Sequence, residues 1–231
     1  MKILTALLIV ALAATPDVAL APEAPAITAV EAPAMDPGRA IPVDDQVNDA
    51  MVDAVIEAMD EIAAQEPSEI VLRFDTPGGY VSSGQRLARH IESMPVPVRC
   101  IVDGQAMSMG FYLLQSCTTR QMTKRSLLLA HEPSTGVRGN RFDMLRVAEE
   151  LRIMSEAMAE HESLKLSISV EEFQEKTAGR DWTLGWKEAV DVGAVDSIIE
   201  VADLPGVNKL EIQQDFLSIL LGGQAGDSFY Y

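Results

Sequence analysis

Hydrophobic residues recur along the chain with two different periods, and each period predicts one kind of secondary structure. Helical spacing is clearest between residues 47 and 64, where the apolar positions of one face are Val47, Met51, Val55, Met59 and Ile62. Short runs rich in β-branched and aliphatic residues predict strands at 70–74, 98–102, 126–130 and 195–201. Further helices are expected at 82–94, 108–114 and 141–164, directly after Ser169, and from a cap at Thr183 to residue 193.

The alternation of these strands and helices predicts an α/β domain in which parallel strands carry helices on their faces. We place this domain at residues 41–205. Residues 22–40 are rich in alanine and proline and are interpreted as a linker. Residues 206–231 are a C-terminal tail with an apolar segment and an aromatic end, which would dock either on its own domain or on a neighbouring subunit.

The N-terminus has the pattern of an export signal. Lys2 precedes an apolar run from Ile3 to about Ala14, which is shorter than the roughly 20 residues that span a bilayer. Residues 1–21 are therefore interpreted as a signal peptide with an undetermined cleavage site, and an uncleaved membrane anchor is the alternative. Export would place the protein in the periplasm or outside the cell.

Charge and cysteine content narrow the choice of partners. A formal net charge of −17 argues against nucleic acid or an anionic membrane surface, since both would repel an acidic protein. Cys100 and Cys117 fit no metal-binding motif. They would be able to pair in an oxidising compartment, but we expect two unpaired, partly buried thiols because one lies in a strand-like run and the other ends a helix-like run. His90 and His161 lie in charged helical segments and are interpreted as solvated.

The first candidate for chemistry is the turn Ala106-Met107-Ser108-Met109-Gly110, which leads from a predicted strand into a predicted helix. It is close to the G-x-S-x-G nucleophile elbow, with alanine in place of the first glycine. Such a turn would expose the Ser108 hydroxyl at the positive end of the helix, where developing negative charge is favoured. Serine is also a common helix cap, so this motif alone leaves both roles open.

Three other segments would be able to serve the Ser108 hydroxyl. Gly79 follows a strand, and the backbone N–H groups of Gly79 and Met109 would together make an oxyanion hole. His131 ends a strand at the sheet edge where ligands bind, and Asp181 would orient its imidazole. Each of these also has an ordinary structural interpretation: a tight turn, a structural histidine and a helix cap.

The order and spacing of these segments resemble those of the Clp protease proteolytic subunit (ClpP) family. The segments DTPGGYVSSG, GQAMSMG, LLLAHEP, GRDW and EAVDVGAVDSII follow the family's order across residues 42–200. The resemblance implies a crotonase-like α/β spiral of parallel strands, with helices on the faces and a protruding handle helix at 141–164 by which subunits interdigitate. It also implies a homo-oligomeric ring with internal active sites.

The resemblance further implies a role for each candidate residue. Ser108 would be the nucleophile, His131 the general base and then the general acid, and Asp181 the residue that orients His131. The N–H groups of Gly79 and Met109 would form the oxyanion hole.

The sequence departs from the family pattern at four points, one of which is the lack of a clear first strand and axial-loop pattern in its N-terminal part. Asp75-Thr76 replaces the usual Asn-Ser before Pro-Gly-Gly. Glu132 replaces the common glutamine after the histidine, and its charge would raise the pKa of the imidazole if it pointed inward. Gly179 stands where the family often has an acidic residue that pairs with arginine across rings, which leaves the stacking of two rings open.

We therefore expect a serine endopeptidase that cuts peptides or unfolded proteins through an acyl-enzyme, with neither cofactor nor metal. Family members usually work with an ATP-driven unfoldase, but ATP is absent outside the cytoplasm, so an exported form would act without an ATPase partner. Three alternatives stay open: an inactive peptide-binding or scaffold protein, a crotonase-type enzyme of acyl-CoA chemistry, and a Ser-Lys peptidase with Lys124 or Lys165 as base.

Overall fold

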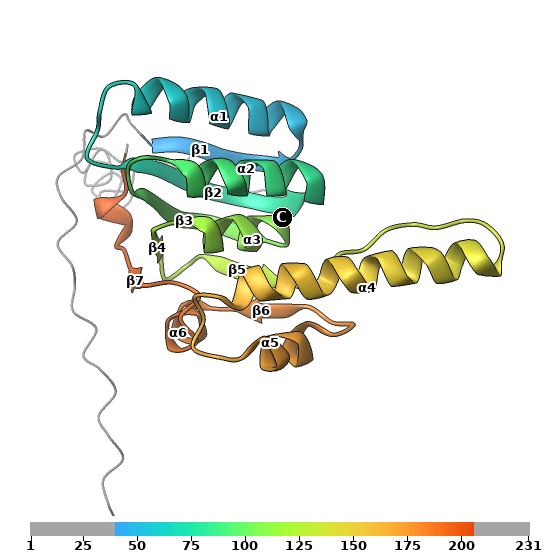
Figure 1. The fold of residues 1–231 in the computed structure, drawn as a ribbon. Coiled ribbons are helices and arrows are strands. Elements are labelled where there is room, and N and C mark those ends of the chain that lie inside the picture. The colour runs from blue at the N-terminus through green and yellow to red at the C-terminus, as the bar shows by residue number, and fades with distance from the viewer. Residues whose placement is uncertain (1–39, 206–231) are drawn as a thin grey trace, which may run out of the picture.

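The computed structural model describes residues 40–205, and the predicted signal peptide, nearly all of the linker and the C-terminal tail lie outside this range. Within it the strands are β1 (Ala40–Val47), β2 (Ile70–Gly79), β3 (Val98–Met107), β4 (Thr119–Met122), β5 (Leu127–Ala130), β6 (Trp182–Leu184) and β7 (Ser197–Ile198). The α-helices are α1 (Asp49–Ala63), α2 (Val81–Ser93), α3 (Met109–Ser116), α4 (Arg141–Ser163), α5 (Val170–Thr177) and α6 (Trp186–Asp191). The predicted α/β class, with parallel strands and helices on the faces, is confirmed (Figure 1). None of the helices in this part of the chain is long and apolar enough to cross a membrane.

The sheet branches at β3, and the branch decides where the site lies. The main strand order is β1-β2-β3-β4-β7, and every neighbouring pair in it is parallel. Residues 99–102 of β3 pair with β4, whereas residues 105–107 pair with β5. β6 then pairs with β5 in the antiparallel direction. The carboxyl end of β3 therefore lies beside β5 and close to the β5–β6 pair.

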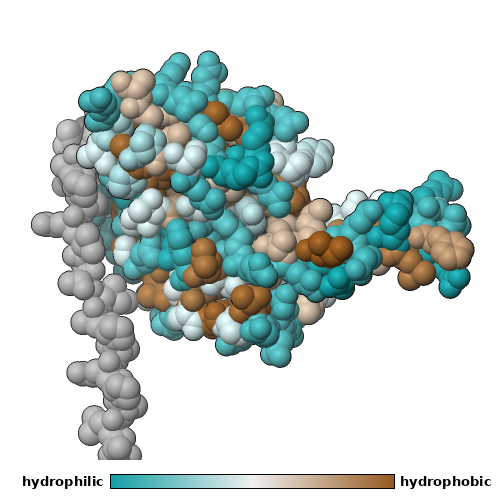
Figure 2. Space-filling model, in the orientation of Figure 1, coloured by the Kyte–Doolittle hydropathy of each residue, from teal (hydrophilic) through white to brown (hydrophobic). Residues whose placement is uncertain are grey.

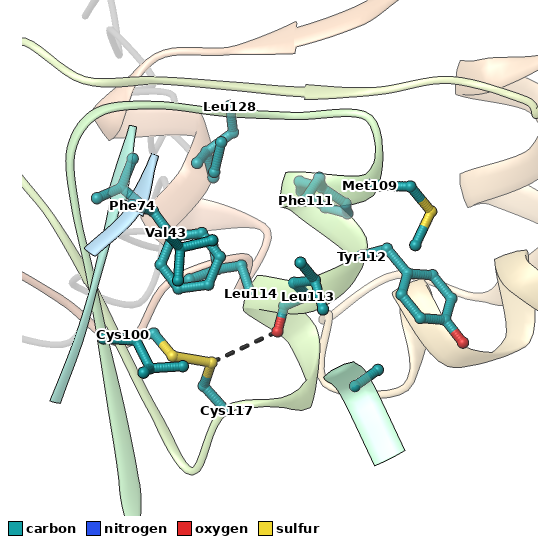
Figure 3. Packing of buried hydrophobic residues seen from close by; sticks show 14 of the residues in the cluster. Val43, Phe74, Cys100, Met109, Phe111, Tyr112, Leu113, Leu114, Cys117 and Leu128 are labelled. Carbon is teal, nitrogen blue, oxygen red and sulfur yellow. Dashed lines mark hydrogen bonds between the residues drawn. A yellow bond between two sulfur atoms is a disulfide. The ribbon is translucent and has the colours of Figure 1, made fainter. Parts of the chain in front are cut away.

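Helices α1, α2 and α3 lie along one face of β1, β2 and β3 (Figure 1). All residues of α3 are buried, as is typical of a helix that is mostly apolar. The central strands β2 and β3 begin with buried runs, because parallel strands are covered on both faces. Phe74, Phe111, Leu114 and Leu128 are fully buried in the core between sheet and helices (Figure 3).

α4 extends away from the rest of the domain, as the resemblance implies for a handle helix (Figure 1). Its buried residues are confined to its C-terminal end and are Met158, Ala159, Glu162 and Ser163. Asn140 and Asp143 form a capping box at its start, which supplies partners for the first free N–H groups. The chain between β5 and α4 begins at His131, next to the sheet. From there it runs out along the helix to its far end (Figure 1).

The hydrophobic pattern misses three strands and misplaces one helix. β1, AIPVDDQV, has three consecutive exposed residues in its second half, so it shows no regular alternation. β4 and β6 are only four and three residues long. Thr183 pairs with Leu129 in β6 instead of capping a helix, and α6 begins after Gly185. Residues 75–79, expected as a loop, continue β2.

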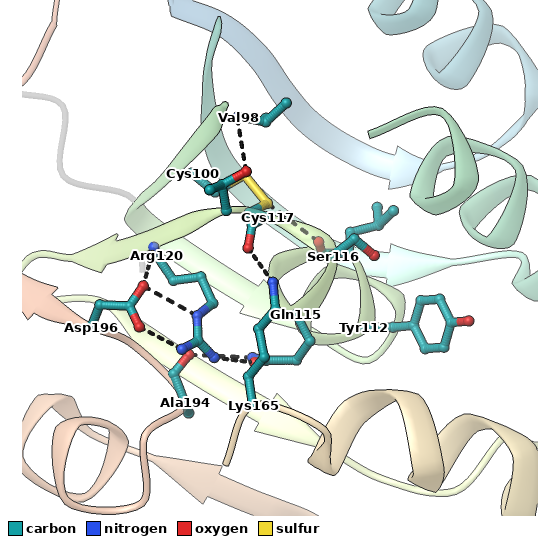
Figure 4. Close-up of a disulfide and its surroundings, with 12 residues drawn as sticks. Val98, Cys100, Tyr112, Gln115, Ser116, Cys117, Arg120, Lys165, Ala194 and Asp196 are labelled. Carbon is teal, nitrogen blue, oxygen red and sulfur yellow. Dashed lines mark hydrogen bonds and ion pairs between the residues drawn. A yellow bond between two sulfur atoms is a disulfide. The ribbon is translucent and has the colours of Figure 1, made fainter. Parts of the chain in front are cut away.

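Cys100 and Cys117 form a disulfide, so the expectation of two unpaired thiols is wrong (Figure 4). Both cysteines are fully buried; Cys100 lies in β3 and Cys117 directly follows α3. They meet because α3 runs back along the strand that precedes it, and the Thr118 N–H donates to the Val98 carbonyl at 2.8 Å. The disulfide thus closes a loop whose far end carries Ser108.

His161 and His90 are both partly buried, so their interpretation as solvated residues is also wrong. The His161 ring stacks on Tyr112 with ring centres 4.1 Å apart, and its Nε2 lies 3.1 Å from Ser116 Oγ. Burial lowers the pKa of His161. His90 Nε2 lies 3.1 Å from a carboxylate oxygen of Asp60. Both histidines therefore connect helices to one another.

Candidate active site

Ser108 occupies a sharp turn between β3 and α3. Its φ of 54° and ψ of −118° lie in a region that non-glycine residues rarely adopt, at a cost on the order of 1–3 kcal/mol. The Ser108 N–H donates to the Leu129 carbonyl at 2.8 Å and the Ser108 carbonyl accepts from the Tyr112 N–H at 3.1 Å, which ties the turn to β5 and α3. The Ser108 side chain makes no capping hydrogen bond, so a capping role for its hydroxyl is wrong.

The hydroxyl of Ser108 lies against His131 instead. Ser108 Oγ is 2.8 Å from His131 Nε2, and His131 Nδ1 is 3.2 Å from Asp181 Oδ1. Because an ionised carboxylate only accepts hydrogen bonds, the Nδ1–H of a neutral ring donates to Asp181 and leaves Nε2 to accept from the serine hydroxyl. The structure therefore brings the three predicted side chains into one hydroxyl–imidazole–carboxylate chain, an arrangement that can activate a serine as a nucleophile.

Strand pairing explains why His131 and Asp181 meet although 50 positions separate them. Ala130, the last residue of β5, pairs with Trp182, the first residue of β6, in antiparallel register. One step beyond this pair, β5 continues to His131 and β6 is preceded by Asp181, so the same register places them opposite each other. Trp182 anchors this end of β6, because its ring is buried and its Nε1 donates to Glu188 Oε1 at 2.9 Å.

The branch of the sheet brings Ser108 to the same place. Met107, the last residue of β3, pairs with Leu129 of β5. Ser108 directly follows β3 and His131 directly follows β5, so both residues lie at the same edge of the sheet. Asp181 is mostly exposed and His131 is one-third exposed, with side-chain accessibilities of 64% and 34%. The site therefore opens to solvent on the side of Asp181.

Gly78 lets the end of β2 approach the Ser108 turn. A Cβ on Gly78 would lie 2.5 Å from the Met107 carbonyl oxygen and 2.7 Å from Ser108 Cβ, and Gly78 has a φ of 90°. Glycine is the residue that tolerates both conditions. The Gly78 N–H is already used, since it donates to Thr76 Oγ1 at 3.1 Å. The sequence pointed to both glycines for a close backbone approach and to Gly79 for the oxyanion hole; in the structure Gly78 is the one that lies against Ser108.

The predicted oxyanion-hole N–H groups belong to Gly79 and Met109, which directly follow Gly78 and Ser108 in the chain. Gly79 follows directly on Gly78, whose Cα faces Ser108, and a Cβ on Gly78 would lie 2.9 Å from the Met109 nitrogen. Met109 is the first residue of α3, and N–H groups in the first turn of a helix have no acceptor within the helix. The two predicted oxyanion-hole amides therefore belong to segments that touch beside Ser108.

Other charged side chains near the site point elsewhere. Glu132 accepts from the Gly179 N–H at 3.1 Å and from Ser155 Oγ at 3.2 Å, so its carboxylate is engaged with the α5–β6 turn and with α4. Lys124 pairs with Glu200 at 2.8 Å. Lys165 donates to the carbonyl of Cys117, at the end of α3 opposite Ser108. These contacts leave His131 as the base within reach of Ser108 Oγ.

The described residues contain no cluster of three or more His, Cys, Asp or Glu side chains with the arrangement of a metal site.

The sequence model of the Clp protease family matches residues 30–202, about three quarters of the chain. The chain is also 28% identical over 174 residues to the ATP-dependent Clp protease proteolytic subunit 2 of Bifidobacterium longum (strain NCC 2705), and this match covers 74% of the chain and 84% of that protein. The family match extends over all the segments that form the site, and the chain therefore belongs to the Clp protease family.

Proposed function

We propose that this protein is a serine endopeptidase in which Ser108 is the nucleophile, His131 the general base and acid, and Asp181 the residue that orients His131. The observation that carries the proposal is the 2.8 Å separation of Ser108 Oγ and His131 Nε2, because a general base must reach the proton that it removes. Membership of the Clp protease family supports a peptide bond as the bond that is cleaved.

The reaction runs in two halves. Ser108 Oγ attacks the carbonyl carbon of the peptide bond while its proton passes to His131 Nε2. The N–H groups of Gly79 and Met109 donate to the resulting oxyanion, and one such donor is typically worth about 3 kcal/mol at the transition state. His131 then protonates the leaving amine, the C–N bond breaks, and an acyl-enzyme ester on Ser108 is left. His131 then takes a proton from water, which attacks the ester carbonyl; the bond from the acyl carbon to Ser108 Oγ breaks, the acid product leaves, and His131 returns the proton to Ser108 Oγ.

We infer that the protein assembles as a homo-oligomeric ring through α4. The projecting part of this helix carries exposed apolar side chains on an otherwise polar surface (Figure 2). Phe142 is 69% exposed, Leu145 56% and Ile153 55%. Large apolar side chains that are exposed together are typical of interaction sites, and the family resemblance supports other copies of this chain as the partner. Sedimentation velocity of the protein and of a Phe142→Ser/Leu145→Ser variant tests this, with a smaller species expected for the variant.

We further propose that the protein works in the periplasm or outside the cell, on short peptides or unfolded proteins, and without an ATPase partner. The N-terminal sequence supports export, and a buried disulfide is what an oxidising compartment would allow. N-terminal sequencing of the protein recovered from a periplasmic fraction tests this part. Recovery in the cytoplasm with residues 1–21 intact would overturn it.

A fluorophosphonate probe, which reacts with activated serine hydroxyls, tests the catalytic proposal. Wild-type protein should be labelled, and both Ser108→Ala and His131→Ala should abolish labelling. Peptide turnover should fall by roughly 10⁴- to 10⁶-fold in either variant. Lys124→Ala is the matched control and should behave as wild type. If folded wild-type protein is not labelled, the protein is a peptide-binding or scaffold protein and the proposal fails.

A further inference from the structure

Glu132 forms a cross-link next to the His131–Asp181 pair. Its carboxylate accepts from the backbone N–H of Gly179 at 3.1 Å. Glu132 directly follows His131, and Gly179 precedes Asp181 by two residues. One side chain thus joins the two segments that carry the imidazole and the carboxylate of the site.

This cross-link lies on the open side of the β5–β6 pair. On the inner side of His131 and Asp181, the backbone pair Ala130–Trp182 holds the two segments together. On the outer side, regular strand pairing has ended, and the Glu132–Gly179 hydrogen bond takes its place. The His131–Asp181 contact is therefore bracketed between a backbone pair and a side-chain bond.

Packing does little to hold the Asp181 segment on this outer side. The Asp181 side chain is 64% exposed. Gly179 has a φ of 63°, and no atom lies within 4 Å of the position that its Cβ would take. A turn with so few neighbours depends on its hydrogen bonds for its position. The Glu132 carboxylate provides one of these hydrogen bonds to the backbone of this turn.

We propose that Glu132 is a positioning residue that holds the Asp181 segment against His131, so that the imidazole keeps the orientation in which Nε2 faces Ser108. This inference rests on the proposed serine peptidase function. Glu132 itself does not touch the reacting atoms, since its two oxygens face Gly179 and Ser155. It acts through Asp181, whose loosening lets the imidazole turn away from the serine.

The chemistry of the bond makes a specific prediction for two variants. A glutamine at this position keeps an oxygen that can accept from the Gly179 N–H, while its NH₂ group can donate to Ser155 Oγ. An alanine keeps neither contact. If position matters and charge does not, Glu132→Gln retains activity and Glu132→Ala loses it. A displacement of about 1 Å in a reacting group can cost up to roughly 100-fold in rate, so we expect about a tenfold loss for Glu132→Ala, where the turn is loosened and not removed.

The experiment measures kcat and KM separately for a short fluorogenic peptide. Glu132→Ala should lower kcat by about tenfold with KM within twofold of wild type, because the lost interaction acts on the catalytic groups and not on substrate binding. Glu132→Gln should stay within about twofold of wild type in both constants. Glu175→Ala, at an exposed carboxylate on α5 near the same turn, is the charge control. Ser155→Ala removes the α4 contact of Glu132 but keeps the Gly179 contact. Both controls should stay within twofold.

Each contrary result overturns the inference in a defined way. A wild-type kcat for Glu132→Ala shows that the cross-link is dispensable. Equal losses for Glu132→Ala and Glu132→Gln show that charge and not the hydrogen bond matters, and equal losses for Glu132→Ala and Ser155→Ala shift the role to α4. A loss that comes with a lower thermal midpoint shows a merely structural role. If Ser108→Ala keeps wild-type turnover, the peptidase proposal itself has failed; if Ser108→Ala is inactive and Glu132→Ala is not impaired, only the present inference has failed.

Discussion

Opening the disulfide between Cys100 and Cys117 should destabilise the domain by an amount that the structure allows us to work out. The two cysteines lie 17 positions apart. In the unfolded chain, closing a loop of this length removes entropy equivalent to about 3 kcal/mol at 25 °C. For a domain of roughly 150–250 residues, each kcal/mol shifts Tm by about 2–4 °C. Reduction is therefore expected to lower Tm by about 6–12 °C.

Packing adds to this loss when the sulfur atoms are removed altogether. Both cysteines are fully buried among the apolar residues of β3 and α3 (Figure 3). Cys100→Ala/Cys117→Ala removes the cross-link and both sulfur atoms, so a cavity term is added to the entropic one. The double variant should consequently melt below the reduced wild-type protein, and its Tm should not respond to reductant.

The assay combines thiol titration with thermal unfolding. Denatured protein that has not been reduced should show no free thiols, and reduced protein should show two. Tm is then measured with and without reductant, with complete reduction verified on the same sample. An unchanged Tm in protein shown to be fully reduced would refute the reasoning, as would two free thiols in protein refolded under oxidising conditions.

Two further predictions concern single buried positions. Gly78→Ala should abolish fluorophosphonate labelling and lower Tm, because its Cβ would lie 2.5 Å from the Met107 carbonyl oxygen and 2.7 Å from Ser108 Cβ. Gly136→Ala is the matched control, because its Cβ would meet no atom within 4 Å. Normal labelling of Gly78→Ala would contradict the close approach. Burial raises the pKa of Glu162 to about 8, above its value in the unfolded chain, so Glu162 binds its proton more tightly when folded and the stability from this group is lost as pH rises toward that value. Glu162→Gln should remove this loss of stability, which is about 1.4 kcal/mol per pH unit. Tm measured at pH 5 and pH 8 in both proteins checks this prediction. The same drop in Tm for wild type and variant would contradict it.

The sequence alone was sufficient for the elements that bury a continuous or periodic apolar surface. The start of β2, the first half of β3, α1 and α4 all appear within a few residues of their expected bounds, because their hydrophobic patterns record which side faces the core. β1, β4 and β6 were missed for the opposite reason: they are short or largely polar, and the strands beside them decide their conformation.

The candidate site shows the same division. Ser108, His131 and Asp181 were found because a strand end, a glycine-rich turn and a known order of motifs are local features of the chain. Their separations of 23 and 50 positions say nothing of distance in space. The branch at β3 and the antiparallel β5–β6 pair bring them together, and both depend on hydrogen bonds between segments remote in sequence.

The amino-acid order by itself was sufficient to predict the residues of the candidate site, the family and the alternation of strands and helices. Only the tertiary structure decided that Cys100 meets Cys117, that Gly78 lies against Ser108, and that Glu132 reaches Gly179. The physical reason is common to all three. Each is a contact between segments whose positions are set by the packing of the whole sheet and its helices, and pairwise contacts of this kind leave no periodic mark in the sequence.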